Sequence, residues 1–222
     1  MNSIVYAVDF ILNLDKSLFG IIQNYGLWTY LLLFLIVFCE TGLVVTPFLP
    51  GDSLIFASAA LAAMGSLNVF TFFIVFFMAA VIGDTVNYYI GKKIGSKILE
   101  KKNMRFIKKE YIIKAHAFYE KHGSMTIVIG RFIPIIRTFV PFVAGMGEMN
   151  YKKFIVYNIL GGFLWVTLFT AGGYFFGNLP FIQDNFSFVL IAIIVISVVP
   201  AIIAFLKERK DAKALNPSKE KE

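Results

Sequence analysis

Long apolar stretches, separated by short polar ones, dominate the chain. A helix that spans a bilayer needs about 20 apolar residues at a rise of about 1.5 Å each. Four stretches are long enough and predict spanning helices: residues 27–46, 67–90, 154–176 and 186–206. Tyr25, Trp28 and Tyr89 lie near the ends of these stretches, as is typical of aromatic side chains at a membrane–water interface.

Two further apolar stretches are interrupted. Residues 54–64 would form a helix of about 17 Å, too short to cross a bilayer, and they follow the helix-breaking run Pro47-Phe48-Leu49-Pro50-Gly51-Asp52. Residues 125–146 are long enough but contain Arg131, Pro134, Arg137, Pro141 and Gly145. We interpret both as re-entrant hairpins, at about residues 47–66 and 125–149. Their shape is expected to depend on Pro47, Pro50, Gly51, Pro134, Pro141 and Gly145.

The N-terminal residues are not typical of a signal peptide, because no basic segment is present and Asp9, Asn13 and Asp15 interrupt the apolar run. We expect residues 1–24 to form an amphipathic helix at the interface. The predicted fold is therefore an all-α polytopic membrane protein, with four spanning helices and two opposed re-entrant hairpins. The membrane domain covers residues 25–206, and residues 207–222 form a basic tail.

Composition excludes a soluble enzyme. Of the 222 residues, 58% are hydrophobic and 16% are charged, whereas globular domains have about 45–50% and about 25%. A soluble fold of this size cannot bury so much apolar surface. The same hydrophobicity excludes a disordered chain, and a single cysteine, Cys39, excludes a disulfide scaffold.

The net charge of +7 is concentrated in two places. Ten of the 21 Lys and Arg residues lie in residues 92–121, and six lie in the tail. The positive-inside rule makes the basic segment 91–124 and the tail cytoplasmic. Four crossings then place both termini in the cytoplasm, and the two hairpins enter from opposite sides. This topogenic role explains the charge better than nucleic-acid binding, for which no motif is present.

A short internal match supports an inverted repeat. Residues 64–68 (Met-Gly-Ser-Leu-Asn) match residues 146–150 (Met-Gly-Glu-Met-Asn) at an offset of 82, and Gly91 matches Gly173. Inverted repeats whose broken helices meet at the midplane recur in transporters. A chance match is the alternative.

Five charged side chains lie inside apolar stretches: Glu40, Asp52, Asp84, Arg131 and Arg137. Each costs about 2.5–3.5 kcal/mol in a membrane helix, so each must pair, become protonated or face water. Internal salt bridges that only fix the hairpins are one explanation. We favour a functional one, because the acids Glu40 and Asp52 flank the first hairpin and are expected to face both arginines of the second.

The starts of two half-helices predict an anion site. Asp52 or Ser53 would cap the helix of residues 54–64, and Thr138 would cap that of residues 139–146, with Pro141 in its first turn. Free N–H groups at these ends suit a phosphate.

We expect a phosphate group to bind Arg131, Arg137, Ser53 and Thr138, and protons to be taken up and released by Glu40 and Asp52. Asp84, Asn87 and Tyr88 share one helix face and give polar support, with helix packing an equally good explanation. No metal-binding, nucleotide-binding or hydrolase motif is present.

The ordered motifs resemble the bacterial DedA membrane proteins, also described as having a SNARE-associated or VTT domain. The resemblance covers about residues 4–206. Its motifs are residues 40–53 (Glu-Thr-Gly to Pro-Gly-Asp-Ser), Gly83-Asp84 through Tyr88 to Gly91, Gly130-Arg131-Phe132-Ile133-Pro134 followed by Arg137-Thr138 and Pro141, Val143-Ala144-Gly145-Met146, and Asn158 with Trp165.

The resemblance implies a lipid transporter of the bacterial cytoplasmic (inner) membrane, because some members are assigned as flippases of undecaprenyl phosphate. The important acids and arginines of the family fall on Glu40, Asp52, Arg131 and Arg137. We expect proton-motive-force-dependent flipping of a phosphate-bearing lipid, with undecaprenyl phosphate as the expected substrate and no cofactor. The expected partners are membrane lipid and protons, and a homo-oligomer is left open.

Two other functions are considered. Members with the same motifs are tied to resistance to cationic compounds, so a proton-coupled exporter of small cations or drugs is the alternative. A membrane-embedded lipid phosphatase is disfavoured, because the apolar stretches contain no histidine.

Overall fold

The computed structural model describes residues 24–43, 51–100, 109–147, 149–185, 188, 189 and 192. The elements formed by these residues are all helical, as the sequence predicts. In chain order they are α3 (Leu27–Gly42), α4 (Gly51–Ala63), α5 (Val69–Glu100), α6 (Lys109–His122), η1 (Gly123–Met125), α7 (Thr126–Ile129), η2 (Gly130–Phe132), α8 (Pro134–Met146), α9 (Tyr151–Gly177) and α10 (Pro180–Asp184).

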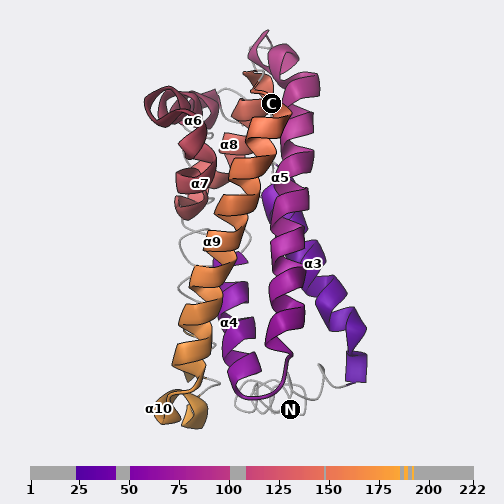
Figure 1. Ribbon diagram of the computed structural model, residues 1–222, viewed down its shortest axis with the longest axis vertical. Coiled ribbons are helices and arrows are strands. Elements are labelled where there is room, and N and C mark those ends of the chain that lie inside the picture. Colours follow the sequence, from indigo (N-terminus) through magenta and orange to yellow (C-terminus); the bar gives the residue numbers. More distant parts are fainter. Residues whose placement is uncertain are drawn as a thin grey trace, which may run out of the picture.

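Two long helices, α5 and α9, lie side by side along the molecule (Figure 1). Their segments Val69–Ile94 and Tyr151–Gly177 are long and apolar enough to cross a membrane. They correspond to the spans predicted at residues 67–90 and 154–176. The predicted span 186–206, the interfacial helix 1–24 and the tail 207–222 fall on residues outside the described ranges, apart from residues 24, 188, 189 and 192.

The first predicted span, residues 27–46, is shorter in the structure than expected. Helix α3 ends at Gly42 after 16 residues, or about 24 Å, which is less than the roughly 30 Å of a hydrocarbon core. Its end lies against the middle of α5, where a Cβ on Gly42 would be 3.3 Å from Cα of Gly83. Leu43 is already extended, and its N–H donates to the carbonyl of Cys39 over 3.1 Å. Hydrophobicity alone overestimated the length of this helix, because the apolar run in the sequence continues past Gly42.

Two half-length helices, α4 and α8, pack against the long ones. Helix α4 lies along α9 and α8 lies along α5, towards opposite ends of the molecule (Figure 1). Glycine makes the second contact close, because a Cβ on Gly145 would overlap the carbonyl oxygen of Tyr88. Gly145 therefore allows close helix packing, and the role in shaping the hairpin that the sequence predicted for it stays a prediction.

The packing has the pairing that an inverted repeat would give. Helix α3 packs on α5 and α4 on α9, while α7 packs on α9 and α8 on α5. Gly91 and Gly173, matched at an offset of 82, each lie against a carbonyl of a half-helix. Asn68 and Asn150, matched at the same offset, each accept a backbone N–H at 2.9 Å at the start of a long helix.

Both half-helices begin earlier than predicted. Helix α8 starts at Pro134, because proline has no N–H to leave unpaired at a first helical position and the preceding Ile133 is extended. Thr138 is therefore one turn inside α8 and does not cap it, and Pro141 lies in the helix interior. Helix α4 starts at Gly51, so Asp52 and Ser53 lie within its first turn and do not precede it.

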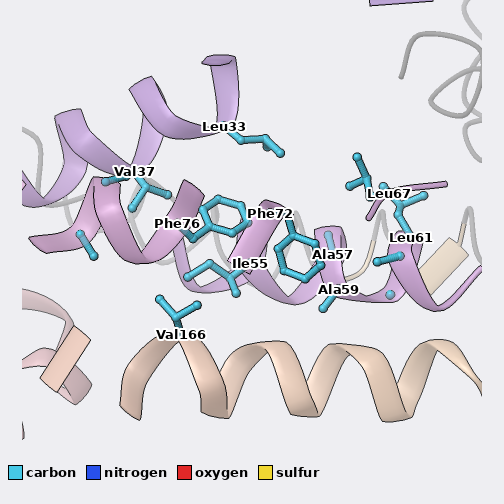
Figure 2. Close-up of a cluster of buried hydrophobic side chains, with 14 of the residues drawn as sticks. Leu33, Val37, Ile55, Ala57, Ala59, Leu61, Leu67, Phe72, Phe76 and Val166 are labelled. Atoms are coloured by element: carbon cyan, nitrogen blue, oxygen red, sulfur yellow. The ribbon is translucent and has the colours of Figure 1, made fainter. Parts of the chain in front are cut away.

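Two apolar cores leave a polar layer between them. One core joins α3, α4, α5 and α9, and Figure 2 shows Ile55 of α4 between Phe76 of α5 and Val166 of α9. The other core lies around Tyr88 of α5 and Phe154 of α9 and includes side chains of α6, α7 and α8. Along α5 the first core ends at Ala80 and the second begins at Tyr88. Asp84, which the sequence placed in an apolar stretch, lies between the two cores.

Candidate functional site

The polar layer contains an ion-pair cluster centred on Arg137. Its guanidinium nitrogen Nη2 donates to Oε1 of Glu40, and Nη1 lies 2.5 Å from Oδ1 of Asp52. The Glu40 side chain is fully buried, that of Arg137 is 9% exposed and that of Asp52 is 33% exposed. The sequence predicted that these two acids face Arg137, and the structure confirms this placement.

Three elements bring this cluster together. Glu40 lies near the end of α3, Asp52 in the first turn of α4 and Arg137 near the start of α8. Gly51 allows the close approach, because a Cβ there would overlap the Glu40 carboxylate. The Glu40 carboxylate therefore lies against the N-terminus of α4, where the partial positive charge of the helix stabilises it.

Trp165 of α9 completes the Arg137 cluster. Its indole N–H donates to Oδ1 of Asp52 over 2.9 Å, and its ring centroid is 5.6 Å from Cζ of Arg137. A cation–π contact of this kind is worth about 0.5–2 kcal/mol, and more when the cation is desolvated. The sequence offered no physical signal for this role, because one tryptophan in an apolar helix usually packs against other apolar side chains.

Arg131 forms a second, separate cluster. Its Nη2 group donates both to Oδ2 of Asp84 on α5 and to Oδ1 of Asn158 on α9. The expectation that Glu40 and Asp52 face both arginines is therefore wrong for Arg131, whose acidic partner is Asp84.

Packing explains this pairing. A Cβ on Gly161 would be 3.3 Å from Cδ and Nε of Arg131, so glycine leaves room for that side chain against α9. Asn158 is itself held in place, because its amide donates to the carbonyl of Val81 over 3.0 Å. The sequence reasoning used Asn158 only as part of a family motif, although a polar amide inside a spanning helix needs a partner and could have been included among the site residues.

The two clusters share one cavity with room for about one water molecule. It is lined by Thr41, Asp84, Arg131, Arg137 and Trp165. Within the described residues, several buried polar atoms around it have no hydrogen-bond partner: Oε2 of Glu40, Oδ1 of Asn87, Nε of Arg131, Nε of Arg137 and Oγ1 of Thr138. An unsatisfied buried polar group costs about 1–3 kcal/mol. The layer therefore has spare donors and acceptors for a small polar or charged group.

The other predicted residues take different places. Asn87 donates to the carbonyls of Thr41 over 3.0 Å and Thr138 over 2.7 Å, and so ties α3 and α8 to α5. Tyr88 donates to the carbonyl of Met149, and Ser53 is half-buried in the first turn of α4. These contacts are structural, in line with the helix-packing explanation for Asn87 and Tyr88. Pro47 and Pro50 lie outside the described residues.

Two long apolar helices, two half-length helices and the buried charges between them are typical of a helical membrane protein, and comparison identifies the family. The VTT domain family matches residues 49–175. The chain is 49% identical over 214 residues to Protein DedA of Escherichia coli (strain K12), covering 96% of this chain and 98% of that protein. The chain belongs to the DedA family of VTT-domain membrane proteins.

More distant relatives agree with this assignment. An uncharacterized membrane protein of Mycobacterium leprae, ML0287, is 42% identical over 169 residues, which is 76% of each chain. The inner membrane protein YqjA of Escherichia coli (strain K12) is 33% identical over 176 residues, covering 79% of this chain and 77% of that protein. No solved structure matches the chain.

Proposed function

We propose that the protein flips a phosphate-bearing lipid across the bacterial cytoplasmic membrane, driven by the proton-motive force, with undecaprenyl phosphate as the expected lipid. One observation carries this proposal. Arg131 and Arg137 are buried, line the same cavity, and each keeps an Nε donor without a partner in the described part of the chain. Paired guanidinium groups in a water-poor site suit a phosphate, which accepts several charge-assisted hydrogen bonds.

The acids around Arg137 supply the coupling step. In the resting state Glu40 and Asp52 occupy its guanidinium group. Protonation of either acid from outside weakens that pairing, and the freed donors bind the lipid phosphate while the apolar tail stays in the bilayer. The cavity is smaller than a phosphate, so α4 and α8 must separate to admit it.

The membrane topology belongs to the same proposal. Helices α4 and α8 have 13 residues each, about 20 Å, so neither crosses a hydrocarbon core of roughly 30 Å alone. Their starts meet at the Asp52–Arg137 pair. We propose that they are the inner arms of two re-entrant hairpins entering from opposite leaflets, in a multi-pass protein with both termini in the cytoplasm.

Native mass spectrometry of the purified protein with its co-purified lipid tests the proposed substrate class. A polyprenyl phosphate should be retained by the wild type and lost in Arg131→Ala and Arg137→Ala. Retention at the wild-type level by both variants would contradict the phosphate role. Release of inorganic phosphate from an added lipid diphosphate would instead indicate a phosphatase and contradict a pure transporter.

A second candidate, a proton-coupled exporter of small cations, is favoured by one observation. Among the described residues, the layer holds three carboxylates and two guanidinium groups, a formal charge of −1 when all are ionised. Competition separates the two functions. If the protein flips a lipid phosphate, a polyprenyl phosphate should protect the site against carboxylate- and arginine-directed reagents. If it exports cations, a cationic dye should give this protection instead.

A further inference from the structure

Asp84 holds the position on Arg131 that an incoming phosphate would need. Its Oδ2 atom bonds Nη2 of Arg131, and the residue is 3% exposed. The same nitrogen also donates to Asn158, an uncharged group that does not compete with the phosphate for charge. Asp84 and Arg131 both line the cavity shared with Arg137. A phosphate that binds Nε of Arg131, which has no partner in the described part of the chain, in a bidentate manner also needs the adjacent Nη2, and therefore displaces Asp84 from it.

A displaced, ionised Asp84 would be a buried charge without a partner, which is strongly unfavourable. Uptake of a proton removes that charge and leaves a carboxylic acid that can donate a hydrogen bond. The groups around Asp84 come from every neighbouring element. Arg131 from η2 bonds Asp84, and Thr41 from α3, Arg137 from α8 and Trp165 from α9 line the cavity with it. The acids Glu40 from α3 and Asp52 from α4 are linked to this cavity through Arg137, and Tyr88 lies one turn along α5.

We propose that Asp84 is a third exchangeable acid of the translocation cycle, which takes up one proton when the lipid phosphate binds Arg131 and releases it when the phosphate leaves. This inference rests on the proposed function. The proton comes from water on the side to which the cavity opens, and the headgroup replaces Asp84 as the anionic partner of Arg131. Asn158 keeps Arg131 in position during the exchange.

The charge count gives the inference a number. The layer carries −1 when ionised, and a phosphate monoester monoanion brings it to −2. A phosphate that binds both guanidinium groups displaces one carboxylate from each, and each displaced carboxylate takes up one proton. Binding to the wild type therefore takes up about two protons, one at Asp84 and one at the Glu40–Asp52 pair, and leaves its layer neutral. A coupling scheme that uses the Arg137 cluster alone would take up about one.

The test measures protons taken up per phosphate bound by the full chain in detergent micelles. Farnesyl phosphate is the probe, and calorimetry is run in buffers of different ionisation enthalpy. The wild type should take up about two protons and Asp84→Asn about one. Asp84→Asn/Asn158→Asp, which moves the carboxylate to the other partner of the same Arg131 nitrogen, should restore about two. A structural role for Asp84 would change affinity but not this stoichiometry.

Asp84→Asn with wild-type proton uptake, or a swap variant that fails to restore uptake, would overturn the role of Asp84. Glu40→Gln/Asp52→Asn leaves Asp84 untouched and keeps the inference falsifiable if Asp84→Asn does not fold. This variant should take up about one proton, and no uptake on binding would overturn the inference. A wild type that does not bind farnesyl phosphate would overturn the proposed function itself, so the two failures are distinct.

Discussion

Trp165 and Asp52 are joined by a hydrogen bond of 2.9 Å, from the indole N–H to carboxylate oxygen Oδ1. The same oxygen lies 2.5 Å from Nη1 of Arg137. A side chain of the long helix α9 thus contacts the ion pair that joins the two half-helices α4 and α8. Any movement that separates Asp52 from Arg137 also changes a contact with α9.

Replacement of Trp165 by phenylalanine removes this hydrogen bond but keeps an aromatic face near Arg137. Because Asp52 is one-third exposed, we expect the free energy of unfolding to fall by about 1 kcal/mol. Trp165→Leu also removes the cation–π contact and should cost about 1–2 kcal/mol more. Unfolding in detergent, followed by circular dichroism, measures both. A Trp165→Phe variant as stable as the wild type would contradict the assigned hydrogen bond.

Replacement of Arg137 should lower the free energy of unfolding chiefly because it leaves a buried carboxylate unpaired. Arg137→Gln leaves the fully buried Glu40 carboxylate without its cation, which typically costs about 3–5 kcal/mol. Adding Glu40→Gln should recover most of that stability, because the fully buried unpaired charge is gone and the remaining Asp52 is one-third exposed. The same unfolding measurement checks this. A double variant no more stable than Arg137→Gln would show that Glu40 is not the partner that matters.

Lipid translocation should not recover with stability when Glu40→Gln is added to Arg137→Gln. Glu40→Gln/Arg137→Gln returns the layer to its wild-type formal charge of −1 but has lost one of the two phosphate-binding guanidinium groups. We expect lipid translocation to stay at the level of Arg137→Gln. Recovery of translocation together with stability would indicate that Arg137 serves only the fold.

The sequence was sufficient to find the charged residues but not their partners. Glu40, Asp52, Arg131 and Arg137 could be predicted because the cost of a charge in an apolar stretch depends on local sequence alone. The pairing of Arg131 with Asp84 could not, because it depends on the room that Gly161 leaves beside α9. Trp165 was noted only as part of a family motif, and its role could not be predicted because its partner Asp52 lies 113 residues away in the chain.

Helix boundaries show a similar division. The spans within α5 and α9 were predictable because their apolar runs are long and uninterrupted. The starts of α4 and α8 were misplaced by several residues. In α8, both Pro134 and Pro141 are compatible with a first helical turn, and the sequence does not distinguish between them. The predicted end of α3 was too late in the chain. The helix ends where Gly42 contacts Gly83 of α5, whereas the apolar run used for the prediction continues beyond that point.

Two neighbouring glycines on α9 test the packing of α4. A Cβ on Gly173 would overlap the carbonyl of Phe56, whereas a Cβ on Gly172 would meet only its ring at 3.6 Å. Gly173→Ala should therefore separate α4 from α9 and lower the thermal unfolding temperature. Gly172→Ala is the matched control and should be neutral or stabilising by up to about 1 kcal/mol, because alanine favours a helix. Equal effects of the two substitutions would contradict the described contact.

Asn87 should matter as a tie between elements. Asn87→Leu leaves the carbonyls of Thr41 and Thr138 without the amide that bonds both. We expect a loss of about 1–3 kcal/mol in the free energy of unfolding. Asn178→Ala is the control, because its amide bonds only the carbonyl of Tyr174 one turn earlier, at an exposed position. A loss in Asn87→Leu no larger than in Asn178→Ala would contradict the bridging role.

The central claim is that the two buried arginines carry a lipid phosphate across the membrane under proton control. The most direct measurement is the rate at which the headgroup of a fluorescent polyprenyl phosphate becomes exposed on the far side of reconstituted vesicles, with and without a pH gradient. The account predicts that the gradient accelerates the wild type, that a protonophore abolishes this acceleration, and that Arg131→Ala and Arg137→Ala reduce exposure to the rate of protein-free vesicles. Wild-type rates in both arginine variants would contradict it.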